Sequence, residues 1–241
     1  MLKVEISGLR ALPRWFDRGY RIGREAGVWL WIGAAFCAQL VLAGTVLAIM
    51  GTDREGTGLA LHDTARLSFL LFWPAYAGGA MATLFGNNFG GLARRGRDFG
   101  LAYAAAQLVH VGLVGRLIVI EGGPFPGSIM PFFAVGVVWT YVLAFSGVDR
   151  LSQVFSPSFW RIIRSIGLEY IALVFFVDLV VRPIEMHAGR LIDYAPFSSL
   201  LILGTFLRAA AAVRRSRLGA KAATFRTTCS HWHRRRSSAA R

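Results

Sequence analysis

The sequence predicts an all-helical membrane protein that crosses the bilayer six times. Hydrophobic residues make up 55% of the 241 residues, and the mean hydropathy is +0.50, which is more apolar than a typical soluble domain. The apolar residues form blocks about as long as the roughly 20 residues that a helix needs to cross the hydrocarbon core. The basic residues gather between these blocks, so membrane topology explains the net charge of +14 better than nucleic-acid binding does.

Residues 1–26 precede the first apolar block and form an amphipathic segment. The stretch "LRALPRWFDRGYRIGREAG" mixes leucines and aromatic residues with arginines. This pattern is typical of a segment that lies on anionic lipid at the membrane surface. We expect the segment to lie on the cytoplasmic side. The block that follows is too long for the apolar core of a cleavable signal peptide, so we expect it to remain as a membrane helix.

Six segments within a transmembrane domain at residues 27–213 are long and apolar enough to be membrane helices. The second contains Pro74 and the small residues Gly78, Gly79 and Ala82, and the third contains "AYAAAQ". Small residues let neighbouring helices approach closely, so we expect these two helices to pack tightly, within a bundle formed by the second to fifth helices. The six segments are 27–51, 66–85, 99–120, 131–148, 165–181 and 197–213.

The lysines and arginines divide unequally between the two sides of the membrane. Six precede the first helix, three lie between the second and third, three lie between the fourth and fifth, and ten lie at the end of the sixth helix and in the tail. That puts 22 of the 27 on one side. Because cytoplasmic loops are enriched in basic residues, both termini are predicted to be cytoplasmic, in a bacterial-type inner membrane.

The tail, residues 214–241, is small, polar and basic without periodicity, so we expect it to be mostly disordered. His231 and His233 have a metal-compatible spacing but no third ligand, which favours a solvated tail. Cys37 and Cys229 are expected to be free thiols. No segment outside the membrane is long enough for a catalytic domain. We therefore expect the chain to be at most the membrane component of an oxidoreductase, and to work with a partner protein.

Polar residues inside the helices need an explanation, because ionisable groups at membrane depth are costly. Tyr103, Gln107 and His110 share one face of the third helix, which we expect to point into the bundle. Glu169, near the inner end of the fifth helix, is positioned to reach basic residues. Asp178 is expected to pair with Arg116 of the third helix, with Arg182 and protonation as the alternatives.

Two stretches resemble a known family. "RRGRDFGLAYAAAQLVH" and "SFWRIIRSIGLEYIALVFFVDLVV" resemble the third and fifth helices of the ferric reductase-like transmembrane domain. That family includes ferric reductases, the membrane domain of NADPH oxidase and the membrane haem subunit of the periplasmic methionine sulfoxide reductase system. Its basic loop, "GL" helix start and haem-ligating histidine correspond to Gly100, Leu101 and His110, and Trp160 and Tyr170 fit the frame of its fifth helix.

The resemblance implies haem b, with His110 as its axial ligand, in a membrane subunit that passes electrons to or from a partner. It also implies that the third and fifth helices face each other across the haems. The arginines before the third helix would then meet haem propionates or an acidic partner surface. These arginines are Arg94, Arg95 and Arg97.

The sequence departs from the family at the other ligand positions. Arg164 and Asp178 stand where the fifth helix has its two histidines, and His62 and His187 fall on the outer side. The alternative is therefore a haem-less subunit with a structural or assembly role in a larger complex. Transport is a weaker third possibility, for which Glu169 and Asp178 are the supporting residues.

Overall fold

A computed structural model describes residues 14–123, 129–146, 156–181, 184 and 191–238. Helices account for nearly all of these residues, and there is no strand among them, which confirms the all-helical fold class. Five helices are long and apolar enough to cross a membrane, as expected for a membrane protein. They cover Gly27–Met50, Arg54–Phe85, Gly96–Glu121, Ile129–Ser146 and Ile192–Leu218.

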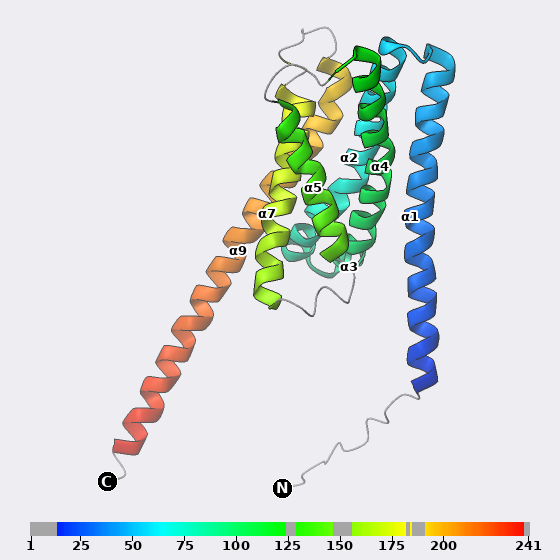
Figure 1. The fold of residues 1–241 in the computed structure, drawn as a ribbon. Helices are drawn as coiled ribbons and strands as arrows, with labels where there is room; N and C mark the ends of the chain where they lie inside the picture. Colours follow the sequence, from blue (N-terminus) through cyan, green and yellow to red (C-terminus); the bar gives the residue numbers. More distant parts are fainter. Residues whose placement is uncertain (1–13, 124–128, 147–155, 182–183, 185–190, 239–241) are drawn as a thin grey trace.

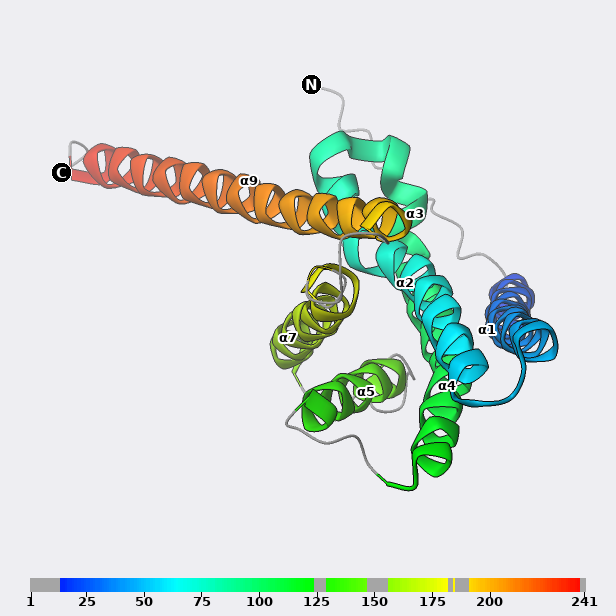
Figure 2. The same ribbon diagram turned by 90° about the horizontal axis from the view of Figure 1, so that it is seen from above.

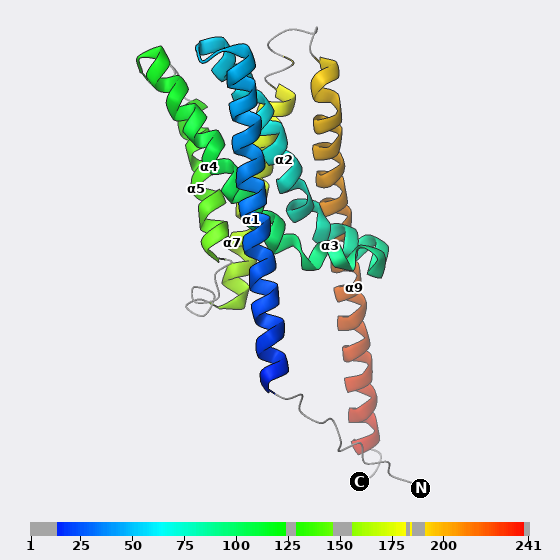
Figure 3. The same ribbon diagram turned by 90° about the vertical axis from the view of Figure 1, so that its right-hand side faces the viewer.

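The long helices stand side by side, and successive helices run in opposite directions (Figure 1). The start of α1 and the end of α9 therefore lie at the same end of the bundle, called here the terminal end. Near this end, the short η1 (Gly86–Phe89) and α3 (Gly90–Arg94) link α2 to α4 and project sideways from the bundle (Figure 3). The long helices are α1 (Arg14–Met50), α2 (Arg54–Phe85), α4 (Gly96–Glu121), α5 (Ile129–Ser146), α7 (Pro157–Phe176), which η2 (Val177–Val181) continues, and α9 (Leu191–Ser238).

Two helices differ from the predicted spans. The second span lies in α2, which begins much earlier, at Arg54, because the Asp53 side chain accepts a hydrogen bond from the Gly56 amide at 2.9 Å and caps the helix. The fifth span lies in α7 and η2. α7 is not among the five apolar helices, because three charged residues fall within its 20 residues: Arg161, Arg164 and Glu169.

The tail also differs from the sequence prediction. Instead of being disordered, residues 214–238 continue α9 as helix, and residues 239–241 lie outside the described part of the chain. The physical reason is that alanine, lysine and arginine are good helix formers, and extending an existing helix needs no new nucleus. At the other terminus, residues 14–26 belong to α1, and residues 1–13 are not described.

The largest buried cluster lies among α2, α4, α7 with η2, and α9, whereas α1 packs against the other side of α2 and α4 (Figure 2). α2 also packs along α4, where Ala102 and Ala106 are fully buried, so the predicted close packing of these two helices is confirmed. Large apolar side chains such as Trp29 and Val119 point outward, as expected for a surface covered by lipid. The buried cluster consists of Phe69, Phe72, Tyr76, Tyr103, Ile171, Ala172, Phe175, Leu179 and Leu201.

Glycines allow the closest helix contacts. A Cβ atom on Gly136 of α5 would lie 2.8 Å from Val174 of α7, and one on Gly167 of α7 would lie 2.8 Å from the ring of Trp139. The same holds between α2 and α9, where a Cβ on Gly204 would lie 3.0 Å from Nε1 of Trp73. These pairs of helices approach each other through small residues, as membrane helices commonly do.

Candidate functional site

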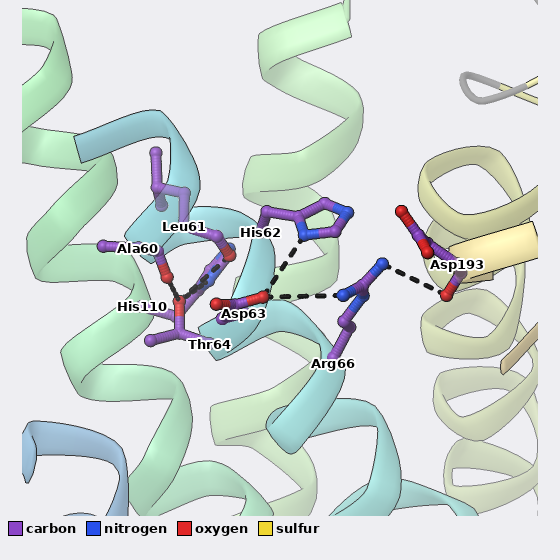
Figure 4. A network of polar contacts seen from close by, with 8 residues as sticks. All are labelled: Ala60, Leu61, His62, Asp63, Thr64, Arg66, His110 and Asp193. Carbon is purple, nitrogen blue, oxygen red and sulfur yellow. Dashed lines mark hydrogen bonds and ion pairs between the residues drawn. The ribbon is translucent and has the colours of Figure 1, made fainter. Parts of the chain in front are cut away.

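The first polar site joins α1, α2 and α4 around Thr64, whose side chain is fully buried. Its hydroxyl oxygen lies 3.0 Å from Nδ1 of His110 (Figure 4). Its backbone carbonyl accepts a hydrogen bond of 2.7 Å from Nε2 of Gln39, which also donates to the Ser68 hydroxyl at 3.2 Å. His110 therefore points to α2, and a hydrogen bond holds it there.

Tyr103 and Gln107 share the α4 face with His110, and Tyr103 is buried whereas Gln107 is partly buried. The Tyr103 hydroxyl lies 3.2 Å from that of Thr140 on α5. The Thr140 hydroxyl donates to the Gly136 carbonyl at 2.9 Å, so Tyr103 is the donor to Thr140. Oε1 of Gln107 is buried and has no hydrogen-bond partner among the described residues.

The second polar site is a charged cluster that joins α2, α7 and α9. Nε and Nη2 of Arg208 both lie 2.7 Å from Oε1 of Glu169, and the Tyr76 hydroxyl donates to Oε2 at 2.8 Å. Arg208 also donates to the Tyr76 carbonyl at 3.1 Å, and its guanidinium carbon lies 4.5 Å from the centre of the Tyr76 ring. The expectation that Glu169 reaches a basic residue is confirmed, and Arg208 is that residue.

Arg116 has a different partner from the one the sequence suggested. Its guanidinium donates to the Thr52 carbonyl at 2.8 Å and to the Thr57 hydroxyl at 3.4 Å. Among the described residues, no ion pair joins it to Asp178. The reason is the turn between α1 and α2, which brings a free backbone carbonyl within reach of α4. Asp178 lies in η2 and acts electrostatically on His62.

A third polar cluster lies on the α9 side of α2 (Figure 4). Asp63 accepts from His62 at 3.4 Å and pairs with Arg66 at 3.6 Å, and Arg66 donates to the Asp193 carbonyl at 3.1 Å. The His62 ring meets Tyr194 edge-on at 4.8 Å. This cluster was not predicted from the sequence, although the spacing of "HDTAR" places Asp63 and Arg66 one helical turn apart and so contains a signal for their pairing.

These positions test whether the residues fit the two bis-histidine haems of the resembled family. His62 precedes Thr64 by two residues, about 200° around the helix, so it points away from the side on which Thr64 meets His110. The rings of Phe72, Tyr103 and Phe175 contact one another across α2, α4 and α7, with centroids 5.3 to 6.0 Å apart. The residues therefore do not fit that pair of haems. The described residues also contain no group of three potential metal ligands.

The fold and these sites define a polytopic, all-helical membrane protein whose interior polar residues contact one another. A comparison with known protein families, with curated protein sequences and with solved structures finds no match for the chain. The function is therefore inferred from the contacts and the chemistry of the described residues.

Proposed function

We propose that the chain spans a bacterial-type inner membrane six times, with both termini in the cytoplasm. The excess of basic residues on one side supports this orientation. The common end of α1 and α9 supports an even number of spans (Figure 1). The 20 residues of α7 and the five of η2 form the fifth span along the chain, which brings the five apolar helices to a total of six spans. At 1.5 Å per residue they extend about 37 Å, enough for a hydrocarbon core of about 30 Å.

Reporter fusions test this topology. A reporter at Arg241 should be active in the cytoplasm, and one inserted in the segment 124–128 should be active outside. Activity of both fusions on the same side would contradict six spans.

We infer that the protein is a structural or assembly subunit of a larger membrane complex, a haem-less counterpart of the subunits that it resembles. The contact of Tyr103 on α4 with Phe175 on α7 carries this inference. By the resemblance, α4 and α7 would be the two helices that face each other across the haems in the family, and here aromatic side chains of the two helices contact each other. His110 bonds Thr64 across α4 and α2, and Tyr76 bonds Glu169 across α2 and α7, as expected for residues that hold helices together.

A single haem b on His110 is the second candidate, and the position of His110 favours it. The ring is held against α2 through Nδ1, and Nε2 has no hydrogen-bond partner among the described residues. A bound haem would add one-electron chemistry, which a partner protein with flavin or nicotinamide chemistry would complete. In either case, the arginines at both ends of the chain would attract anionic lipid or an acidic partner.

An absorption spectrum of the purified full-length protein separates the two candidates. Expression is supplemented with a haem precursor, and a known b-haem protein is expressed in parallel as a positive control. A structural subunit gives no reduced-minus-oxidised Soret or α band. A band that disappears in His110→Ala supports the haem subunit instead, and a band that survives this substitution contradicts both candidates.

A further inference from the structure

The hydroxyl of Thr64 has three polar neighbours, but it has one proton to donate. Its oxygen lies 2.7 Å from the Ala60 carbonyl oxygen, 3.0 Å from the Leu61 carbonyl oxygen and 3.0 Å from Nδ1 of His110 (Figure 4). A hydroxyl offers one hydrogen and two lone pairs. Which neighbour receives the hydrogen decides which nitrogen of His110 carries a proton.

The distance to Ala60 settles this choice. Two oxygen atoms 2.7 Å apart repel each other unless a proton lies between them, and this distance is typical of an O–H···O hydrogen bond. Threonine in a helix commonly donates in this way to the carbonyl four residues earlier. The proton of Thr64 is therefore used within α2, and its oxygen faces His110 with a lone pair.

Nδ1 of His110 must then be the donor. Its distance of 3.0 Å from the Thr64 oxygen is typical of an N–H···O hydrogen bond. Thr64 is fully buried, and His110 lies partly buried against it. The hydrogen bond from Gln39 to the Thr64 carbonyl holds the same turn of α2 against α1.

We propose that Thr64 is a positioning residue that fixes neutral His110 as the tautomer with its proton on Nδ1. Nε2 is then the nitrogen that presents a lone pair, ready to accept a hydrogen bond or to ligate a metal centre. This assignment concerns the ring itself and holds for both candidate functions.

The test is ¹⁵N NMR of the full-length protein in lipid nanodiscs, with labelled histidine. The signals of His110 are identified among the five histidines by their loss in His110→Gln. The proposal predicts a protonated, pyrrole-type signal for Nδ1 and an unprotonated, pyridine-type signal for Nε2. A wild-type spectrum with the proton on Nε2 would overturn it.

Three variants test the role of Thr64. Thr64→Val keeps the shape and removes the acceptor, so the ratio of the Nδ1–H form to the Nε2–H form should fall about fivefold or more, the effect of one lost hydrogen bond. Thr64→Ser should restore the ratio. Ser68→Ala is the matched control, because Ser68 is a buried hydroxyl on the same helix that binds Gln39 and has no hydrogen bond to His110 among the described residues.

An unchanged ratio in Thr64→Val, or an equal fall in Ser68→Ala, would overturn the assignment to Thr64. If Thr64→Val fails to accumulate, Thr64→Ala takes its place with the same expected fall. The wild-type and Thr64→Ser spectra decide the tautomer independently of both variants.

Discussion

α2 carries two polar sites, one made of neutral groups and one that contains an ion pair, and they differ in how the polar side chains are stabilised inside the bundle. Near its start, Thr64 meets Gln39 and His110 in a cluster that contains no carboxylate, guanidinium or ammonium group. Twelve residues later, about 18 Å along the helix, Tyr76 meets the ion pair of Glu169 and Arg208.

The two clusters differ in how many partners each group needs. In the Thr64 cluster the neutral groups make few hydrogen bonds: Gln39 donates to the Thr64 carbonyl and the Ser68 hydroxyl, and Thr64 donates to the Ala60 carbonyl. Arg208 instead has a carboxylate, a carbonyl and an aromatic ring as partners, and its side chain keeps 22% exposure. Arg208 therefore keeps its charge inside the bundle with several partners and partial exposure, because the cost of desolvating an ion exceeds that of a neutral group.

The largest effect is expected from breaking the charged cluster. Glu169→Gln leaves Arg208 without its carboxylate and should destabilise the protein by about 2–3 kcal/mol, below the full cost of a buried pair because half of the Glu169 side chain is exposed. Thermal or denaturant unfolding in detergent measures this loss.

The double mutant with Arg208→Gln is the control for this pairing. It should lose much less than the sum of the two single losses, because the second substitution removes a charge that has already lost its partner. If the losses in the free energy of unfolding of the two single mutants add up to that of the double mutant, Glu169 and Arg208 are not energetically coupled, and the proposed difference between the two clusters is wrong.

The next effect tests packing without any polar group. Gly167→Ala puts a methyl group 2.8 Å from the Trp139 ring and should cost about 1–2 kcal/mol through overpacking of α5 against α7. Gly112→Ala on α4 is the matched control, since its Cβ meets nothing within 4 Å. Equal stability of the two variants would show that the α5–α7 contact is looser than the structure has it.

The smallest effect is expected at the ion pair between Arg54 and Glu121, where the atoms are 2.9 Å apart, the glutamate side chain is 20% exposed and the arginine side chain is 77% exposed, so the arginine keeps its contact with solvent when the carboxylate is removed. Glu121→Gln should change the free energy of unfolding by less than about 1 kcal/mol, as is usual for solvent-exposed pairs. A loss as large as that of Glu169→Gln would contradict the view that the cost depends on how far the arginine partner is buried, since Arg208 is 22% exposed and Arg54 is 77% exposed.

Hydrophobic patterning was sufficient to predict most of the fold. A long apolar block satisfies its backbone hydrogen bonds as a helix and can face lipid with its side chains, so α1, α4, α5 and α9 lie where the apolar blocks are. The early start of α2 was missed, because its first turns are polar and depend on the Asp53 cap. The helical tail was not predicted because its composition resembles that of disordered segments, although its residues favour the extension of an existing helix.

The site was predictable where two side chains pair by charge or share a helix face. Glu169 found a basic partner, and Tyr103 and His110 both turn inward. Arg116 was suggested to pair with Asp178, but it donates to a backbone carbonyl in a turn, which the pattern of side chains does not predict. Thr64 was missed for a similar reason, since nothing in the sequence distinguishes a threonine that accepts from a histidine from one that merely packs.

We propose that His110 holds α4 to α2 by a hydrogen bond from Nδ1 and carries no cofactor. Unfolding and visible absorption, measured together for wild type, His110→Asn and His110→Leu, test this proposal. No haem band is expected in any of the three. His110→Leu should lose about 0.6–2 kcal/mol of stability, and His110→Asn should lose less, because its amide can replace the Nδ1 donor. A wild-type haem band that disappears in both variants, with equal losses of stability, would show that the proposal is wrong.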